Sequence, residues 1–500
     1  MARIRSNLSA IFLALFLFGC GASRNASLTV FHWNDFHAQN IPREVTSKDS
    51  SGVETRYRVG GAAILKHYLD SMRTTRPFSI TLHAGDEFQG TPISSLTKGA
   101  SQVRLLGEYG LDAFTFGNHE FDYGRENLER LFSKVGFPVV SADLWDKTRG
   151  RYFVKPVTII KRGPLRIGVI GLAPKNLFSL SLRNNLRGLE VLPVEKVVRK
   201  FVRELRESGC DVVIVLSHLG YSGDKALARK VKGIDIIVGG HSHTALRRPV
   251  KINNTVIVQA GSRGRYLGVL DVKVDLDDDR LASWSGFLLE TREGVKPDSL
   301  MQAVVDSLEA IAGKELNQVI GILETDWVRH YKSESNIGDW MADVTRDFTG
   351  SDVAFQNSGG IRKNLPAGEI KARDVWEIAP FGNYFVKFEV SGKVLRSMLE
   401  WQAAGKGEFC QVSGLRYVVK NRKLVSATVQ GHPIDPDRVY SIATNNYVGD
   451  HLHDVFGLDE SAVTVVPVKP NYLDRDVFID YIKKQGRVRS VVQGRIRKEK

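Results

Sequence analysis

Short apolar runs alternate with amphipathic segments along the first half of the chain. Runs typical of buried strands cover residues 28–31, 78–82, 113–116, 165–170, 212–216 and 234–238. Between them, apolar residues recur at helical spacing over residues 62–72, 125–135 and 194–207. This alternation predicts a layered α/β domain. Two further apolar runs flank Gly261 and Gly264, so residues 255–275 are expected to form a β-hairpin.

The pattern changes after residue 290. A charged stretch with helical spacing and no strand signal lies within residues 291–316, which predicts a helix that links two domains. Apolar runs and helical patterns then resume. We therefore expect a first domain at residues 28–290 and a second α/β domain at residues 317–500.

The N-terminus has the pattern of a secretory signal, in which arginines precede a short apolar run, here residues 10–18. That run is about half of the roughly 20 residues that a transmembrane helix needs. It ends in a segment that resembles the lipobox of bacterial lipoproteins, Leu17-Phe18-Gly19-Cys20. The resemblance implies a signal peptide at residues 1–19, a tether at residues 20–27, and a lipid on Cys20 that anchors the protein in the cell envelope, on its periplasmic or outer-membrane face. A plain secretory peptide with an incidental cysteine is the alternative.

Composition excludes several classes of protein. Of 500 residues, 42% are hydrophobic and 25% are charged, which is typical of globular proteins and not of disordered, collagen-like or polytopic membrane chains. Three cysteines exclude a disulfide-dense scaffold, and Cys210 and Cys410 are expected to be buried without a disulfide. The net charge is +14, but Lys and Arg are dispersed, and the basic tail at residues 487–500 lacks interleaved aromatics. No nucleic-acid partner is therefore expected.

Six polar clusters follow directly on apolar runs. They are Asp35-Phe36-His37, Gly85-Asp86, Gly117-Asn118-His119-Glu120, Ser217-His218, Gly239-Gly240-His241-Ser242-His243 and Gln259-Ala260-Gly261-Ser262. Because loops at one end of a layered α/β sheet converge in space, these carboxylates, imidazoles and amides are expected to meet. Each cluster alone is an unspecific signal, and the third is the most specific of them.

These residue types fit a centre of two divalent metal ions. Oxygen and imidazole ligands without thiolates favour Mn, Fe, Zn, Co or Mg. Alternate residues of an extended segment point the same way, so Asp35 and His37 are expected to hold one ion together. The lone carboxylate of Asp86 can bridge two ions about 3.5–4 Å apart.

The order of the clusters resembles the calcineurin-like metallophosphoesterases, and more closely their 5′-nucleotidase and UDP-sugar hydrolase branch. In the first half, the likeness rests on Asp35-x-His37, Gly85-Asp86, His218, Gly240-His241-Ser242-His243 and the motif Gly117-Asn118-His119-Glu120-Phe121-Asp122-Tyr123-Gly124. In the second half it rests on Asn357-Ser358-Gly359-Gly360-Ile361-Arg362 and Pro380-Phe381-Gly382-Asn383. The resemblance covers residues 28–500. It implies a four-layer αββα sandwich followed by an α/β substrate-binding domain.

The resemblance also implies roles for single residues. One ion would be held by Asp35, His37, Asp86 and His243, and the other by Asp86, Asn118, His218 and His241. His119 and Asp122 match the catalytic dyad of the family, in which the carboxylate orients the imidazole. The anionic part of the substrate would bind Arg362, the nucleoside would bind Asn357 and Asn383, and the base would stack on Phe381.

Two departures from the family concern the site for the base. Many relatives carry a glycine-rich stretch before an aromatic residue, and residues 445–456 lack it. Tyr447 or Phe456 could supply the missing ring. Asn336 also stands where the ecto-enzymes have an arginine.

The sequence thus predicts a monomeric hydrolase of the cell envelope that releases phosphate from nucleoside 5′-monophosphates through metal-assisted attack of water. A 2′,3′-cyclic nucleotide phosphodiesterase or a UDP-sugar pyrophosphatase on the same metal centre stays open, because residues 445–456 are altered. A non-catalytic surface lipoprotein is a third hypothesis, which the complete set of candidate metal ligands disfavours.

Overall fold

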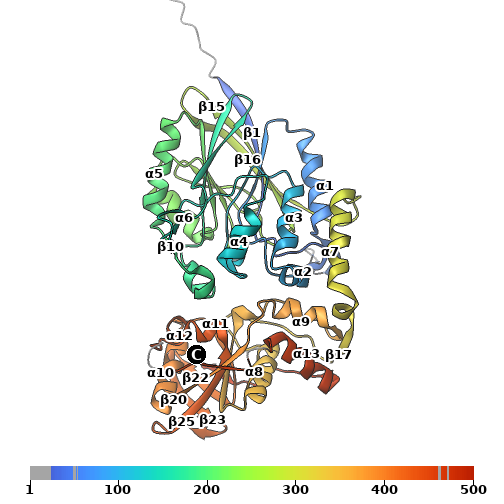
Figure 1. The fold of residues 1–500 in the computed structure, drawn as a ribbon, viewed down its shortest axis with the longest axis vertical. Helices are drawn as coiled ribbons and strands as arrows, with labels where there is room; N and C mark the ends of the chain where they lie inside the picture. Colours follow the sequence, from blue (N-terminus) through green and yellow to red (C-terminus); the bar gives the residue numbers. More distant parts are fainter. Residues whose placement is uncertain (1–23, 49–51, 53, 460–462, 470–471, 500) are drawn as a thin grey trace, which may run out of the picture.

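A computed structural model describes residues 24–48, 52, 54–459, 463–469 and 472–499. Two α/β domains follow one another along the long axis of the molecule, and helix α7 (Ser299–Asn317) runs beside the first and leads to the second (Figure 1). The proposed signal peptide and Cys20 lie outside the described residues. Within those residues, no helix is long and apolar enough to span a bilayer.

The first domain contains two large sheets. The first sheet has the strand order β16 (Arg280–Glu290), β15 (Tyr266–Asp275), β1 (Asn25–Trp33), β4 (Ser79–His83) and β5 (Ala113–Phe114). The second has the order β13 (Val250–Ile252), β14 (Thr255–Val258), β12 (Ile236–Gly239), β11 (Val212–Ser217), β9 (Leu165–Leu172) and β8 (Val157–Arg162). Strands β1, β4 and β5 are parallel, and so are β9, β11, β12 and β14.

Alternation along the strands builds four layers. On β1, Leu28 and Val30 face the second sheet, while Phe31 and Trp33 face the opposite way. The outer face of the first sheet is covered by α1 (Ala62–Arg73), α2 (Pro92–Leu96), α3 (Ala100–Glu108) and α4 (Arg125–Phe132). The outer face of the second sheet is covered by α5 (Val194–Glu207) and α6 (Tyr221–Lys230). The four-layer αββα arrangement expected from the resemblance is therefore confirmed.

Shorter elements complete the first domain. They are the strands β2 (Arg43–Lys48), β3 (Glu54–Val59), β6 (Leu144–Asp146), β7 (Arg151–Tyr152) and β10 (Leu189–Val191), and the 3₁₀ turns η1 (His119–Phe121), η2 (Leu177–Ser179) and η3 (Arg183–Leu186).

Helix α7 occupies most of the region in which a linker helix is expected. It begins at Ser299, later than residue 291, and contacts α1 of the first domain and α9 (Ala372–Ile378) of the second. Gly313 interrupts the helix with φ 67 and ψ 178, a backbone conformation outside the helical region. An ion pair of 2.5 Å between Glu309 and Arg373 ties α7 to α9.

The second domain is also mixed α/β. Its main sheet has the order β21 (Cys410–Ser413), β18 (Val353–Asn357), β25 (Val439–Asn445), β20 (Phe385–Ser391) and β26 (Val466–Val468). Smaller sheets are formed by β24 (His432–Pro433), β23 (Lys423–Val429), β22 (Leu415–Lys420) and β28 (Ile496–Glu499), and by β19 (Gly368–Lys371), β17 (Val319–Leu323) and β27 (Arg487–Val488). The remaining helical elements are α8 (Asn336–Thr349), η4 (Ser358–Gly360), α10 (Gly392–Ala403), α11 (Asn446–Gly449), α12 (Leu452–Phe456) and α13 (Asp474–Gln485).

Two local predictions differ from the structure. The β-hairpin expected at residues 255–275 is wrong, because β14 pairs with β12 and β13 in the second sheet whereas β15 pairs with β1 and β16 in the first. The connection crosses the sandwich, and an apolar run does not specify its pairing partner. Residues 25–27, expected in a tether, belong to β1, where Ala26 and Ser27 pair with Val274 and Lys273.

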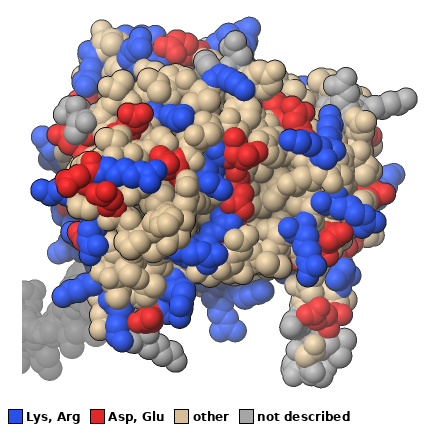
Figure 2. Space-filling model, turned by 90° about the horizontal axis from the view of Figure 1, so that it is seen from below, with Lys and Arg blue, Asp and Glu red and all other residues tan. Residues whose placement is uncertain are grey.

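The charged side chains and the cysteines can be compared with the sequence-based predictions. On the end of the molecule formed by the second domain, Lys and Arg side chains are interspersed with Asp and Glu and uncharged residues (Figure 2). Both Cys210 and Cys410 are buried and free, which confirms the prediction for them.

Candidate metal centre and active site

The polar clusters meet because their strands are parallel. Asp35 follows β1, Asp86 follows β4, Asn118 follows β5, His218 follows β11 and His241 follows β12. The carboxyl ends of these strands lie at one edge of their sheets, as the sequence predicts.

Three groups of side chains can each hold a metal ion, because their ligand atoms lie within 4.8 Å of one another. The groups are Asp35, His37 and His243; His37, Asp86 and His119; and Asp86, His218 and His241. Asp86 belongs to two of the groups. This agrees with the expectation that its carboxylate bridges two ions. All seven metal ligands named from the sequence except Asn118 are among these residues, and Asn118 lines the adjoining cavity.

Hydrogen bonds orient the imidazoles. His37 donates through Nδ1 to the carbonyl of Gln89 at 3.1 Å, and His218 donates through Nδ1 to the carbonyl of Ala84 at 2.5 Å. A carbonyl oxygen only accepts, so these bonds fix the tautomer and leave each Nε2 as a free ligand atom.

The backbone at the ligands is left-handed. Asp35, His37, Asp86, His241 and His243 have φ between 51° and 71°. The extended Asp35-x-His37 segment expected from the sequence is therefore wrong, and the two side chains converge through tight turns instead. Left-handed backbone costs a non-glycine residue on the order of 1–3 kcal/mol, and such strain gathers at functional sites.

One buried carboxylate that the sequence leaves without a role holds the loops together. Glu120 accepts hydrogen bonds from four backbone N–H groups: Asp86 at 3.0 Å, Glu87 at 2.7 Å, Phe88 at 3.3 Å and Gly117 at 2.6 Å. It thereby joins the loop after β4 to the loop after β5. Its place in the Gly-Asn-His-Glu motif is the only sequence signal for it.

Several buried atoms of the site lack partners within the described chain. Asn118 Oδ1 and His218 Nε2 are buried and make no hydrogen bond there. His37 Nε2 lies 3.0 Å from His243 Nε2, and His218 Nε2 lies 3.2 Å from Asp86 Oδ2. Imidazole nitrogens, carboxylate oxygens and an amide oxygen that converge in a buried space are typical of a site that holds cations. The residues therefore fit a dinuclear divalent centre.

The surroundings shift the pKa values of these side chains. Burial, and then the neighbouring His243, hold the pKa of His37 well below its usual range, and burial with His218 lowers the pKa of His241 to about 4. Both imidazoles are thus neutral near pH 7, the form that binds a metal ion. Burial also disfavours charge on His218, but the Asp86 carboxylate outweighs it and raises the pKa to about 10, so in the absence of a cation Nε2 carries a proton that a metal ion would have to displace.

His119 and Asp122 form the expected pair. The distance from His119 Nδ1 to Asp122 Oδ2 is 2.7 Å, and the backbone N–H of His119 donates to Asp86 Oδ1 at 3.0 Å. Burial lowers the pKa of His119, but Asp122 and Asp86 outweigh that effect and the net pKa is raised. The imidazole is 7% exposed, at the floor of the cavity.

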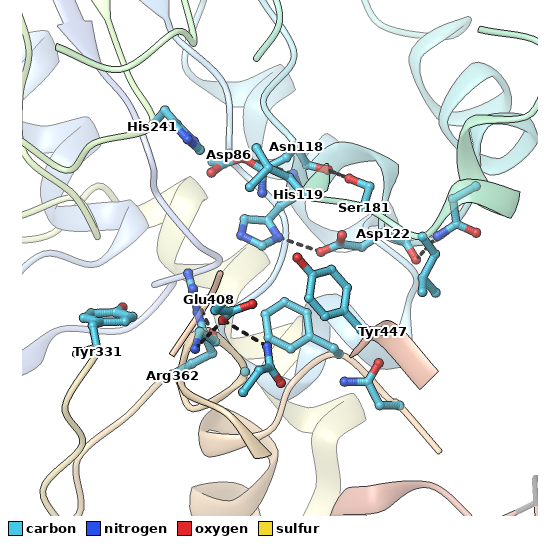
Figure 3. A pocket seen from close by; sticks show the side chains of 18 of the residues that line it. Asp86, Asn118, His119, Asp122, Ser181, His241, Tyr331, Arg362, Glu408 and Tyr447 are labelled. Carbon is cyan, nitrogen blue, oxygen red and sulfur yellow. Dashed lines mark hydrogen bonds and ion pairs between the residues drawn. The ribbon is translucent and has the colours of Figure 1, made fainter. Parts of the chain in front are cut away.

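A cavity of about 520 Å³ lies between the two domains and adjoins the metal centre. From the first domain it is lined by Asp86, Asn118, His119, Asp122, Leu180, Ser181, Leu182, Asn185, His241, Ser242 and His243. From the second domain it is lined by Arg329, Tyr331, Asn357, Gly359, Gly360, Arg362, Phe381, Asn383, Glu408 and Tyr447. Figure 3 shows Arg362, Glu408 and Tyr447 facing His119 and Asp122 across this space.

Of the aromatic residues considered for stacking on the base, Phe456 does not lie at the cavity, whereas Tyr447 and Phe381 do. Phe456 is 2% exposed and packs on Phe355 in the core of the second domain, with ring centroids 4.8 Å apart, so it does not reach the cavity. Tyr447 lines the cavity, and Phe381 stacks on His119 at 5.7 Å with an interplanar angle of 25°. Phe456 is the last residue of α12.

The two domains touch around the cavity. Tyr447 donates its hydroxyl hydrogen bond to the carbonyl of Ser179 at 2.8 Å, and the ring of His451 lies 3.1 Å from the carbonyl of Phe178. Ser95 donates to the carbonyl of Pro380 at 3.2 Å. The side chains with which the second domain lines the cavity are therefore held close to the metal centre.

Both polar atoms of the Asn357 side chain already have hydrogen-bond partners in the protein, although the sequence predicts that this side chain contacts a nucleoside. Its Oδ1 accepts from Asn445 Nδ2 at 2.9 Å, and its Nδ2 donates to Glu408 Oε1 at 3.1 Å. Glu408, Arg329 and Tyr331 line the cavity but are absent from the sequence-based prediction. Single polar residues in loops carry no periodic signal, so only the fold reveals them.

Comparisons with known proteins agree with this geometry. The family model for the calcineurin-like phosphoesterases matches residues 28–245, and that for the 5′-nucleotidase C-terminal domain matches residues 316–456. A snake venom 5′-nucleotidase of Gloydius brevicauda is 27% identical over 536 residues, covering 95% of this chain and 89% of that protein. Endonuclease YhcR of Bacillus subtilis is 28% identical over 452 residues, which are 84% of this chain and 37% of the endonuclease.

The fold has a solved counterpart. The structure of a 5′-nucleotidase precursor from Thermus thermophilus superimposes with a TM-score of 0.84 at 29% sequence identity, covering 95% of this chain and 99% of the other. The metal clusters, the His119–Asp122 pair and both domain matches point the same way. The chain is a metal-dependent phosphoester hydrolase with a dinuclear divalent centre, and it belongs to the 5′-nucleotidase family of calcineurin-like metallophosphoesterases.

Proposed function

We propose that this protein releases phosphate from nucleoside 5′-monophosphates. The observation that carries the proposal is the interdomain cavity, in which the His119–Asp122 pair faces Arg362 and Phe381. One wall therefore offers groups for hydrolysis of a phosphoester, and the other offers a guanidinium for an anion and a ring for a planar base.

The metal ligands are assigned as the resemblance implies. Asp35, His37, Asp86 and His243 would hold one divalent ion, and Asp86, Asn118, His218 and His241 the other. Such a pair of ions lowers the pKa of water and offsets charge on phosphoryl oxygens. The protein contributes tautomers fixed by Gln89 and Ala84 and loops joined by Glu120, so the ligand atoms are preorganised.

His119 and Asp122 serve the leaving group. In the hydrolysis, an oxygen of water forms a bond to phosphorus and the bond from phosphorus to the ester oxygen breaks. The ester oxygen then needs a proton, which a protonated His119 can donate through Nε2. Asp122 holds Nδ1 at 2.7 Å, which fixes the ring orientation and stabilises the charged imidazolium.

The second domain binds the rest of the substrate. Arg362 suits the phosphate because its planar fork can form two parallel hydrogen bonds. Phe381 and Tyr447 line the same cavity and offer two ring faces for the base. Asn383 also lines it and is 7% exposed.

A substrate panel tests the proposal. Hydrolysis by the purified protein with Mn²⁺ is followed by chromatography of the products for AMP, UMP, 2′,3′-cyclic AMP, UDP-glucose and a bare aryl phosphate. The nucleoside monophosphates should be turned over fastest. The aryl phosphate has no nucleoside for the second wall, and the cyclic nucleotide and UDP-glucose carry no terminal phosphate monoester. Faster turnover of the cyclic nucleotide or UDP-glucose would show that the changed residues 445–456 redirect the same metal centre to another phosphoester. Hydrolysis of the aryl phosphate as fast as AMP would refute recognition of the nucleoside.

We also propose that the protein acts outside the cytoplasm as a monomer anchored by a lipid on Cys20. The N-terminal pattern of arginines, a short apolar run and Leu17-Phe18-Gly19-Cys20 supports this proposal. In cells, the Cys20→Ser variant should move from the membrane fraction to the soluble or unprocessed fraction. Wild-type protein that is fully soluble would refute the anchor, and light scattering measures the mass in solution.

A further inference from the structure

Glu408 is held by one carboxylate oxygen only. Its Oε1 accepts hydrogen bonds from Asn357 Nδ2 at 3.1 Å and from the backbone N–H of Gly359 at 2.7 Å. Asn357 is itself fixed, since its Oδ1 accepts from Asn445 Nδ2 at 2.9 Å. This chain of contacts holds the Oε1 side of the carboxylate in place.

The second oxygen of Glu408 is uncommitted. The side chain is half-buried and lines the cavity, and no donor among the described residues reaches Oε2. No Lys, Arg or His in the described ranges forms an ion pair with it either. Burial raises the pKa of the carboxyl group, while Asn357, Gly359 and the more distant Arg362 and His451 favour its ionised form. A cavity that binds an anionic substrate therefore presents one strong, unpaired hydrogen-bond acceptor.

The negative charge of Glu408 limits which part of the substrate can lie beside Oε2. A carboxylate repels a phosphate group and accepts hydrogen bonds only from donors. Because a nucleoside monophosphate has no cationic group near neutral pH, the group beside Oε2 would be a neutral donor. In the proposed function, Arg362 binds the phosphate. Its Nη1 bonds the carbonyl of Gly359 at 3.4 Å, and the N–H of the same Gly359 bonds Glu408. The donor is thus a group close to the phosphate, which in a nucleotide is a sugar hydroxyl and not the base.

We propose that Glu408 recognises the sugar, with Oε2 accepting a hydrogen bond from a ribose hydroxyl, so that the cavity selects ribonucleotides over deoxyribonucleotides. The inference rests on the proposed 5′-nucleotidase function and names its substrate class more closely. Asn357 and Asn445 are positioning residues in this scheme. The role expected for Asn357 from the sequence, direct contact with the nucleoside, passes to Glu408.

The test compares kcat/KM for AMP, 2′-deoxy-AMP and 3′-deoxy-AMP. Losing a hydrogen bond to a charged acceptor lowers the rate by about 10- to 100-fold, so the wild-type protein should favour AMP by that factor over at least one deoxy analogue. Glu408→Gln retains an oxygen for Asn357 and Gly359 but replaces Oε2 by an NH₂ group, which donates. In this variant the ratio should fall to within about threefold of unity. Glu389→Gln, an exposed glutamate of β20, is the matched control and should keep the wild-type ratio.

Two readouts separate this role from a structural one. Asn357→Ala releases Glu408 without removing it, so the ratio should fall partway, mainly through KM. A wild-type ratio near unity would overturn the inference, as would a Glu408→Gln variant in which all rates fall together and the ratio stays unchanged. Both results leave the proposed function standing if AMP is still cleaved faster than aryl phosphate. Failure to cleave AMP faster than aryl phosphate overturns the proposed function, and the role of Glu408 with it.

Discussion

The Glu120→Gln variant tests whether the metal loops depend on one buried carboxylate. Oε1 accepts from Glu87 and Phe88, and Oε2 accepts from Asp86 and Gly117. Glutamine keeps one oxygen, so one pair of N–H donors faces an NH₂ group whichever way the amide turns. A hydrogen bond to a charged group contributes about 1.5–3 kcal/mol, and two such bonds give a loss of about 3–6 kcal/mol.

Thermal unfolding measured by circular dichroism gives the size of this effect. In a domain of this size, 1 kcal/mol lowers Tm by about 2–4 °C, so a drop of at least about 6 °C is expected. The measurement is made at pH 8, above the pKa of about 7 to which burial and Asp86 raise Glu120. Added Mn²⁺ should also stabilise the variant less than the wild type, because Asp86 and Asn118 are less well placed.

A control and a refuting outcome complete the experiment. Glu126→Gln changes an exposed glutamate at the start of α4 and should leave Tm within about 2 °C of the wild type. If Glu120→Gln also stays within 2 °C and binds Mn²⁺ equally well, the backbone donors are satisfied in another way. The argument that this carboxylate joins the two loops would then be wrong.

Four further outcomes are expected. His119→Ala should lower kcat by roughly 100- to 10,000-fold while metal content by mass spectrometry stays the same; an unchanged kcat would exclude it as the acid. Arg362→Lys should lower kcat/KM by about tenfold or more, because an ammonium cannot form two parallel bonds to phosphate. Removal of metal by a chelator should abolish phosphate release, and Mn²⁺ should restore it. Burial raises the pKa of Asp143 to about 7, so the folded state retains a proton that the unfolded state loses near pH 4, and stability falls as pH rises from about 4 to 7. The Asp143→Asn variant lacks this fall in stability, so its Tm minus that of the wild type should increase from pH 5 to pH 8. An equal Tm difference at both pH values would show that Asp143 does not titrate in that window.

The spacing of apolar residues was sufficient to locate helices and strands whose buried face is defined by their own sequence. Residues 194–207 were expected as a helix, and α5 has the same bounds, since an amphipathic face of that length has one way to be buried. The strand before each polar cluster was located for the same reason. The clusters then had to meet, because parallel strands place their carboxyl ends at one edge. The fold class and the convergence of the polar clusters follow from these two facts, whereas the ligand set of each ion follows from the family resemblance.

The periodicity of apolar residues did not predict which strands pair or which side chains meet across the fold. Strands β14 and β15 have the apolar character of a hairpin, but each has a closer partner in a different sheet. Phe456 has the chemistry of a stacking ring but lies in a core that no local pattern defines. Whether an aromatic residue faces a cavity or a core depends on elements far away in the chain.

The sequence by itself determined the type of chemistry, because ligand types and their order after strands are local properties. Only the tertiary structure decided the geometry that makes this chemistry specific. It placed Asp35 and His37 on left-handed turns and gave Glu120 four backbone donors. It also brought Glu408 to the wall of the interdomain cavity and hydrogen-bonded it to Asn357. The physical reason is that a buried polar group is defined by its partners, and those partners come from segments that only folding brings together.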